Sequence, residues 1–161
     1  MENGTFRIYQ SPNVVNLCID TYDGERQGGR LWNQYMTEPF CFSTLIEALE
    51  SMEALYDRLC YPYASTETRS FLEEGCREVG EEGILDTRGR EHRVVEPFHR
   101  LISHRGQDAT FIIRVQYRQH SSWQGEIVWV DGGRRRYFRS VLELLKLIDS
   151  AMEKDTVHAG K

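Results

Sequence analysis

Arginine and aromatic side chains crowd one short stretch near the end of the chain. Three consecutive arginines are followed at once by Tyr137, and two tryptophans precede them. Guanidinium groups make forked contacts with phosphates and carboxylates, while aromatic rings stack on bases or fill pockets in partner proteins. These residue types predict a surface that binds a partner. The residues expected to form it are Trp123, Arg134, Arg135, Arg136 and Arg139.

The same arginines have a second interpretation. Charged side chains on the outermost strand of a sheet prevent that strand from pairing with another chain. The net charge of −5 also disfavours a nucleic acid as the partner, because phosphates repel an acidic protein. Residues 110–161, however, hold nine basic residues against six acidic ones. Binding of RNA or single-stranded DNA therefore stays as the alternative to binding another protein or a nucleoprotein complex.

The histidines do not follow the spacing of a metal site. Metal ligands that are close in sequence usually have spacings such as three or four residues on a helix, or two between cysteines. In this chain the spacings between His92, His99 and His104 are seven and five, and His120 lies further on. We therefore expect surface histidines and no bound metal.

Carboxylates gather in the first part of the chain without a catalytic pattern around them. Asp23 precedes a glycine, a pair that is common in turns because the Asp side chain bonds the local backbone. No phosphate-binding glycine loop and no nucleophile elbow occurs. The sequence therefore predicts neither a cofactor nor catalytic activity. The acidic residues of this part are Asp20, Asp23, Glu25 and Glu38.

Cysteine usage indicates a reducing compartment. Cys18, Cys41, Cys60 and Cys76 form no CxxC pair, and free thiols are typical of cytoplasmic proteins. The first residues lack the basic and apolar segments of a secretory signal. No apolar run approaches the roughly 20 residues of a membrane-spanning helix. We expect a cytoplasmic protein with no membrane contact.

Two parts of the sequence carry the same order of structural signals. Residues 15–56 can be aligned on residues 111–152 without a gap, at a constant shift of 96 positions. Few residues are identical, but Gly29 falls on Gly125 and the apolar positions coincide. Repetition of such signals at one shift predicts a repeated structural unit.

Each of these parts begins with three predicted strands. Apolar residues at every second position indicate the first strand, and short β-branched or aromatic runs indicate the next. The third strand is short and ends in a phenylalanine. The predicted strands are 14–22, 29–35 and one ending at Phe42, then 110–118, 125–130 and one ending at Phe138.

Each part then closes with a predicted helix whose start is a capping box. The hydroxyl of Thr44 or Ser140 can accept from a free backbone N–H, and a Glu three residues later can reach back to the cap. Apolar residues at spacings of three and four follow. In the second helix we expect Leu145 on the buried face.

The expected fold is α+β, with two β-β-β-α repeats in which an antiparallel meander precedes one helix. A three-stranded unit buries little surface alone, so the two units should share one core about an approximate two-fold axis. The sheets could join edge to edge or pack face to face. The expected parts are 1–60 for the first unit, 61–109 for a partly ordered connector with a hairpin near 87–89, and 110–161 for the second unit with a short flexible tail.

The strings TFIIRVQYRQHSSWQGEIVWVDGG and FRSVLELLKLIDSA resemble a group of uncharacterised bacterial proteins associated with gut bacteria and mobile elements. The resemblance is clearest over 110–152 and implies a bacterial, cytoplasmic context without naming any chemistry. Together with the absent catalytic motifs, it predicts a non-catalytic binding protein. Such a protein would act as an inhibitor or accessory factor, for example against a bacterial defence system, by covering the surface of a macromolecular partner.

Overall fold

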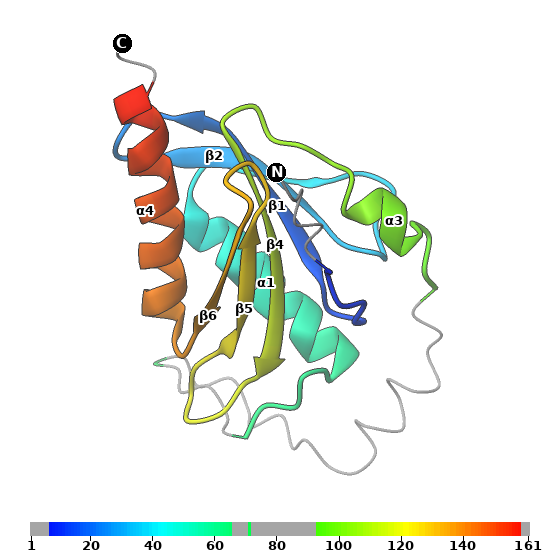
Figure 1. The fold of residues 1–161 in the computed structure, drawn as a ribbon. Helices are drawn as coiled ribbons and strands as arrows, with labels where there is room; N and C mark the ends of the chain where they lie inside the picture. Colours follow the sequence, from blue (N-terminus) through cyan, green and yellow to red (C-terminus); the bar gives the residue numbers. More distant parts are fainter. Residues whose placement is uncertain (1–6, 66–70, 72–92, 159–161) are drawn as a thin grey trace.

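The computed structural model describes residues 7–65, Phe71 and residues 93–158. The chain forms one six-stranded antiparallel sheet in the order β3-β2-β1-β4-β5-β6 (Figure 1). The two three-stranded halves join edge to edge through β1 and β4, so the face-to-face arrangement does not occur. The strands are β1 (Val15–Tyr22), β2 (Gln27–Trp32), β3 (Phe40–Phe42), β4 (Ala109–Tyr117), β5 (Gln124–Trp129) and β6 (Arg134–Phe138).

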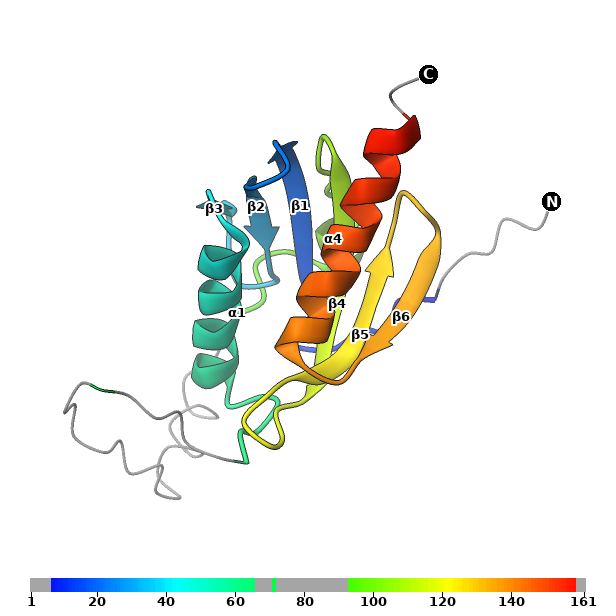
Figure 2. The ribbon, with the colours of Figure 1, turned by 90° about the vertical axis from the view of Figure 1, so that its left-hand side faces the viewer.

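Two long helices, α1 (Leu45–Leu59) and α4 (Val141–His158), cover one face of the sheet, as Figure 2 shows. The short helix α3 (Phe98–Leu101) packs on the opposite face. We call the face under α1 and α4 the helix face and the other one the back face. The α+β class and the predicted strands and long helices are confirmed.

Strand periodicity explains how the core is divided between the two faces. Alternate residues of β1 and β4, such as Leu17 and Ile113, point to the helix face and form the main core with both long helices. Their neighbours in sequence point to the back face. A smaller apolar cluster there includes Ile112, Val128 and Leu101 of α3.

The helix starts follow the predicted capping boxes, with one difference. The Oγ1 of Thr44 accepts the N–H of Glu47 at 3.4 Å, and the Oγ of Ser140 accepts that of Glu143 at 3.1 Å. The Glu47 carboxylate accepts the N–H of Ser43 at 2.8 Å, and not that of the cap residue itself.

The most deeply buried leucine of α4 is Leu144, and not its neighbour Leu145 as expected. Leu144 and Ile148 are fully buried, whereas Leu145 is only half-buried and Leu142 is exposed. The second helix is apolar on most sides, so its sequence alone did not fix which stripe meets the sheet. The helix also continues past Met152 to His158.

Part of the expected connector is ordered against the sheet. Residues 93–108, which showed no clean period, contain α3 and lie on the back face. The hairpin expected near 87–89 lies outside the described residues.

Candidate functional site

Strand alternation splits the three consecutive arginines between the two faces of the sheet. Arg134 and Arg136 lie on the helix face and line a cavity with Leu147 of α4. Arg135 lies on the back face, where its guanidinium faces the Glu126 carboxylate at 3.6 Å. The expectation that these arginines share one surface is therefore wrong, because neighbouring residues of a strand point in opposite directions.

Trp123 does not belong to an exposed surface, and that expectation is also wrong. Only 6% of the residue is exposed, and its ring meets Tyr56 of α1 edge to face at a centroid distance of 5.3 Å and an angle of 75°. His120 and Ser121 both take left-handed backbone conformations, with φ of 54° and 57°. This reversal turns the chain back toward the sheet and delivers the indole into the core.

Arg139 and Arg118 have contacts within the chain. Arg139 is exposed and pairs with Glu143, one helical turn away, at 3.1 Å. The buried Arg118 donates to the Pro62 carbonyl at 2.7 Å and to the Asp57 carboxylate at 2.6 Å. Arg118, which directly follows β4, therefore links this strand to the end of α1 and is unavailable to a partner.

A cluster of arginines and tyrosines does gather on the back face of β4, β5 and β6. The ring of Tyr9 lies within reach of three guanidinium groups, whose central carbons are 5.2 Å (Arg114), 5.6 Å (Arg7) and 5.7 Å (Arg135) from its centroid. Guanidinium groups at this distance are attracted to the face of an aromatic ring. We call this cluster, with the exposed tyrosines beside it, the arginine–tyrosine surface; its residues are Arg7, Tyr9, Arg114, Tyr117, Arg135 and Tyr137.

A buried carboxylate holds the arginines of this surface in place. Glu126 on β5 is 4% exposed, and its Oε1 accepts from the Nε of Arg114 at 2.9 Å. Its Oε2 lies 3.6 Å from the Nε of Arg135, and the Nη2 of Arg135 donates to the backbone carbonyl of Arg7. A buried charge requires such pairing, so the guanidinium groups are fixed beneath the ring of Tyr9.

Three tyrosine rings remain accessible on the arginine–tyrosine surface. Tyr9 is 45% exposed, Tyr117 57% and Tyr137 65%. Tyr137 lies opposite Glu126 in the β5–β6 ladder, and Tyr117 lies opposite Gln124 in the β4–β5 ladder. Large aromatic side chains seldom gather in solvent on a monomeric protein without a binding role.

The sequence held only part of the signal for this surface. The period of two within β6 could have separated Arg135 from Arg134 and Arg136. Tyr9, in contrast, precedes the first strand, and its contacts with β4 and β6 depend on where residues 7–13 cross the back face. Asn13 fixes that path by donating to the Val115 carbonyl at 2.6 Å.

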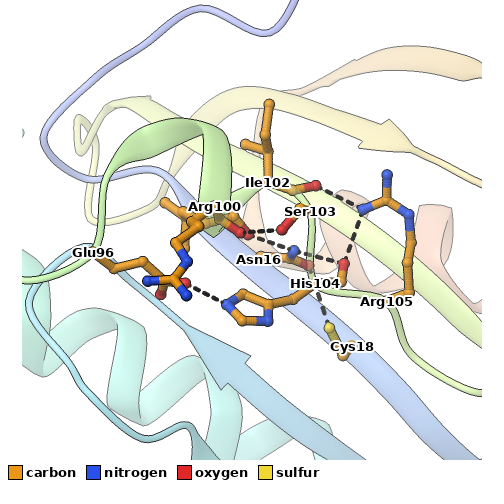
Figure 3. A network of polar contacts seen from close by, with 9 residues as sticks. Asn16, Cys18, Glu96, Arg100, Ile102, Ser103, His104 and Arg105 are labelled. Carbon is orange, nitrogen blue, oxygen red and sulfur yellow. Dashed lines mark hydrogen bonds and ion pairs between the residues drawn. The ribbon is translucent and has the colours of Figure 1, made fainter.

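A second polar cluster lies on the back face of the other half (Figure 3). His104 Nε2 contacts Glu96 Oε1 at 2.5 Å, and the imidazole stacks on the Trp32 indole at a centroid distance of 3.7 Å. Asn16 Nδ2 donates to the carbonyls of Leu101 and His104, both at 2.9 Å. These contacts attach residues 96–104 to the sheet.

Cys18 belongs to this cluster but cannot serve as a nucleophile. The thiol is fully buried and donates to Asn16 Oδ1 at 3.4 Å. Burial raises the pKa of Cys18 to about 11, so the reactive thiolate is not populated at neutral pH. The cluster is therefore structural.

Two of the acidic residues of the first half, Asp20 and Asp23, also have structural partners. Asp20 pairs with Arg30 at 2.8 Å, and this hydrogen bond holds the pKa of the Asp20 carboxyl below its ordinary value. Asp23 accepts the N–H groups of Glu25 and Arg26 within its turn. Among residues 7–65, 71 and 93–158, no three His, Cys, Asp or Glu side chains come together as a metal site; His92 and Cys76 lie outside these ranges.

Comparison with protein-family models, with curated proteins and with solved structures finds no match to this chain. Within the part of the chain that the structure describes, no helix has the length and apolar character needed to cross a membrane.

Proposed function

We propose that the chain is a non-catalytic binding protein that covers part of another protein, or of a nucleoprotein complex, with the arginine–tyrosine surface. The observation that carries this proposal is the Tyr9 ring held among three guanidinium groups above the buried Glu126. An inhibitor or accessory factor of a bacterial mobile element, acting in the cytoplasm, remains the biological setting that we propose.

Both the residue types of this surface and the fixed conformations of its arginines suit protein recognition. Tyrosine and arginine dominate the binding energy of many interfaces because each offers a large contact area and directional hydrogen bonds. Arg114 and Arg135 are fixed by Glu126, so little side-chain freedom would be lost on binding. Tyr117 and Tyr137 extend the same face with accessible rings.

The exposure of the charges favours a protein over a nucleic acid. The side chains of Arg114 and Arg135 are only 22% and 19% exposed, and Glu126 offsets part of their charge. Phosphate binding requires accessible positive charge, and of the three arginines of this surface only Arg7 is exposed. The tyrosine rings could still stack on bases, so RNA or single-stranded DNA is the alternative that the experiment must separate.

We also infer that the chain contains two copies of one β-β-β-α unit related by an approximate two-fold axis. Strand registers support this: Asn16 pairs with Ile112, its own equivalent at the shift of 96, in the β1–β4 ladder. Both β1–β2 and β4–β5 carry a register shift at equivalent positions, Ile19/Thr21 and Val115/Tyr117.

Two glycines support the same inference. A Cβ on Gly29 would lie 1.9 Å from the Cys18 carbonyl oxygen, and one on Gly125 would lie 2.1 Å from that of Arg114. No side chain fits at either place, so both units require glycine beside their bulges.

The inferred repeat allows residues that the fold requires to be distinguished from residues that a binding partner would require. At the shift of 96, Arg114 corresponds to Cys18, and Tyr137 corresponds to Cys41. The same backbone therefore forms without arginine or tyrosine at these positions. The strand residues of the arginine–tyrosine surface therefore occur in the second unit alone, which favours a role in binding.

The proposal is tested by capture of partners from a nuclease-treated bacterial lysate with the tagged full chain. Wild type should retain a protein partner, and Tyr117→Ala with Tyr137→Ala should lose it while remaining folded. The matched control removes two exposed apolar side chains from the helix face, Ile46→Ala with Leu142→Ala, and should retain the partner.

Two outcomes contradict the proposal. Retention that the tyrosine variant does not weaken would place the interface elsewhere. Retention that disappears with nuclease, together with salt-sensitive binding of a labelled single-stranded RNA by the purified chain, would favour the nucleic-acid alternative.

A further inference from the structure

A cavity of about 90 Å³ lies between α4 and the strands β5 and β6, on the face opposite the arginine–tyrosine surface. Its inner wall is apolar and includes Phe111, Ile127 and Leu147. Arg134 and Arg136, both exposed, complete the lining from β6. The cavity thus combines an apolar interior with two positive charges, and none of its lining residues is acidic.

The two arginines have little charge compensation from the chain. Among the described residues, neither Arg134 nor Arg136 enters an ion pair, and Arg136 donates only to the neighbouring Arg135 carbonyl at 2.8 Å. They lie two positions apart on one strand and so project from the same face. An anion between them would reduce their mutual repulsion and accept forked hydrogen bonds.

The Trp129 indole forms part of the cavity wall. The Nε1 of Trp129 is buried and has no hydrogen-bond partner. Gly132 keeps the indole in place, since a Cβ there would lie 2.1 Å from the ring.

We propose that this cavity binds a small carboxylic acid with a short branched apolar group. An apolar cavity of roughly 150 Å³ accommodates benzene, so one of this size suits a smaller aliphatic group. The aliphatic group would contact Phe111 and Leu147, and the carboxylate would lie toward Arg134 and Arg136. The inference does not depend on the proposed function, because the two sites use opposite faces of the sheet.

The test is a titration of the ¹⁵N-labelled full chain with 3-methylbutanoate, followed at the Trp129 indole N–H resonance, which the Trp129→Phe variant assigns. We expect a saturable shift with a dissociation constant on the order of 1 mM, as for other very small ligands. Acetate lacks the apolar group and 3-methylbutanol lacks the charge, so each should bind at least about tenfold more weakly.

Variants assign the binding to the cavity. Arg134→Gln with Arg136→Gln should weaken binding at least about tenfold, because both carboxylate partners are lost. Arg139→Gln removes the same charge from a residue outside the cavity and should change binding less than about twofold. Cross-relaxation between the ligand methyls and Leu147 should appear in wild type.

The proposal is overturned if the Trp129 resonance shows no saturable shift up to the solubility limit of the acid. It is also overturned if the Arg134/Arg136 variant, with a spectrum that shows it folded, binds as tightly as the Arg139 variant.

Discussion

Trp123 and Tyr137 lie in the same half of the sheet but in opposite surroundings. The Trp123 indole packs on Tyr56 in the main core, whereas Tyr137 is mostly in solvent on the back face. Trp123→Ala should lower the free energy of unfolding by about 3–5 kcal/mol, the usual loss for a buried aromatic ring. Tyr137→Ala should change it by less than about 0.5 kcal/mol. Urea unfolding of both variants measures the difference, and equal losses would contradict this placement of Trp123.

Asp20 should make a pH-dependent contribution to stability. The hydrogen bond from Arg30 lowers the pKa of the folded carboxyl below that of the unfolded chain. Its contribution is therefore complete above the unfolded value and is lost as the pH falls through the lower, folded value.

The variant Asp20→Asn should unfold more easily than wild type at pH 7, by about 0.5–1 kcal/mol for a partly exposed pair. The difference should shrink as the pH falls below about 4, where the carboxyl is ordinarily protonated. Thermal unfolding between pH 7 and pH 3 measures it. Arg30→Gln should reduce the same dependence, because only the N–H of Gln107 then donates to Asp20. A difference between wild type and Asp20→Asn that grows toward low pH would show that the pairing with Arg30 is not its source.

At the residue scale, local sequence patterns predicted the secondary structure more accurately than they predicted which side chains are exposed. The alternation within Arg134–Arg136 was readable, since a strand sends neighbours to opposite faces. The burial of Trp123 was not, because it depends on two left-handed residues, His120 and Ser121, that are not glycines. A prediction that a single residue contacts a partner fails where such backbone geometry decides the direction of its side chain.

At the element scale, α4 provides a direct check on which stripe meets the sheet. Leu144 is fully buried and its neighbour Leu145 is half-buried. Leu144→Ala should cost about 2–5 kcal/mol of stability, and Leu145→Ala clearly less. Chemical denaturation of the two variants measures this, with the exposed Leu142→Ala as the control. A larger loss at Leu145 would mean that the helix is rotated relative to this packing.

Asn16 of β1 is one of the side chains that attach residues 96–104 to the sheet. Asn16 Nδ2 bonds the carbonyls of Leu101 and His104 from a fully buried position. Asn16→Ala should speed hydrogen exchange in α3 and cost about 1–3 kcal/mol, because buried acceptors lose their donor. Unchanged exchange in α3 would show that its apolar contacts alone hold it.

The strands and long helices were predictable because their signals are local: a period of two, a period of 3.6 and a capping box. α3 was not, because its sequence has no clean period and its position depends on contacts far away in the chain. Asn16 and Leu101 are separated by 85 positions. The edge-to-edge joining of β1 and β4 is likewise a long-range choice.

At the scale of the whole molecule, the back face is unequal between the two halves. Residues 93–108 cover the half that contains Asn16 and Trp32. In the other half, Leu101 of α3 packs with Ile112 and Val128, and residues 7–13 cross the face. Beside this crossing the arginine–tyrosine surface is open. The back face is thus covered over one half of the sheet and more accessible over the other.

Hydrogen exchange of the full chain, measured free and bound to its captured partner, tests the central claim most directly. The account predicts slower exchange on binding in residues 7–13, at the ends of β4 and β5, and along β6. Exchange in α1 should stay unchanged. Protection confined to α1 and α4, or to the half covered by residues 93–108, would contradict the account.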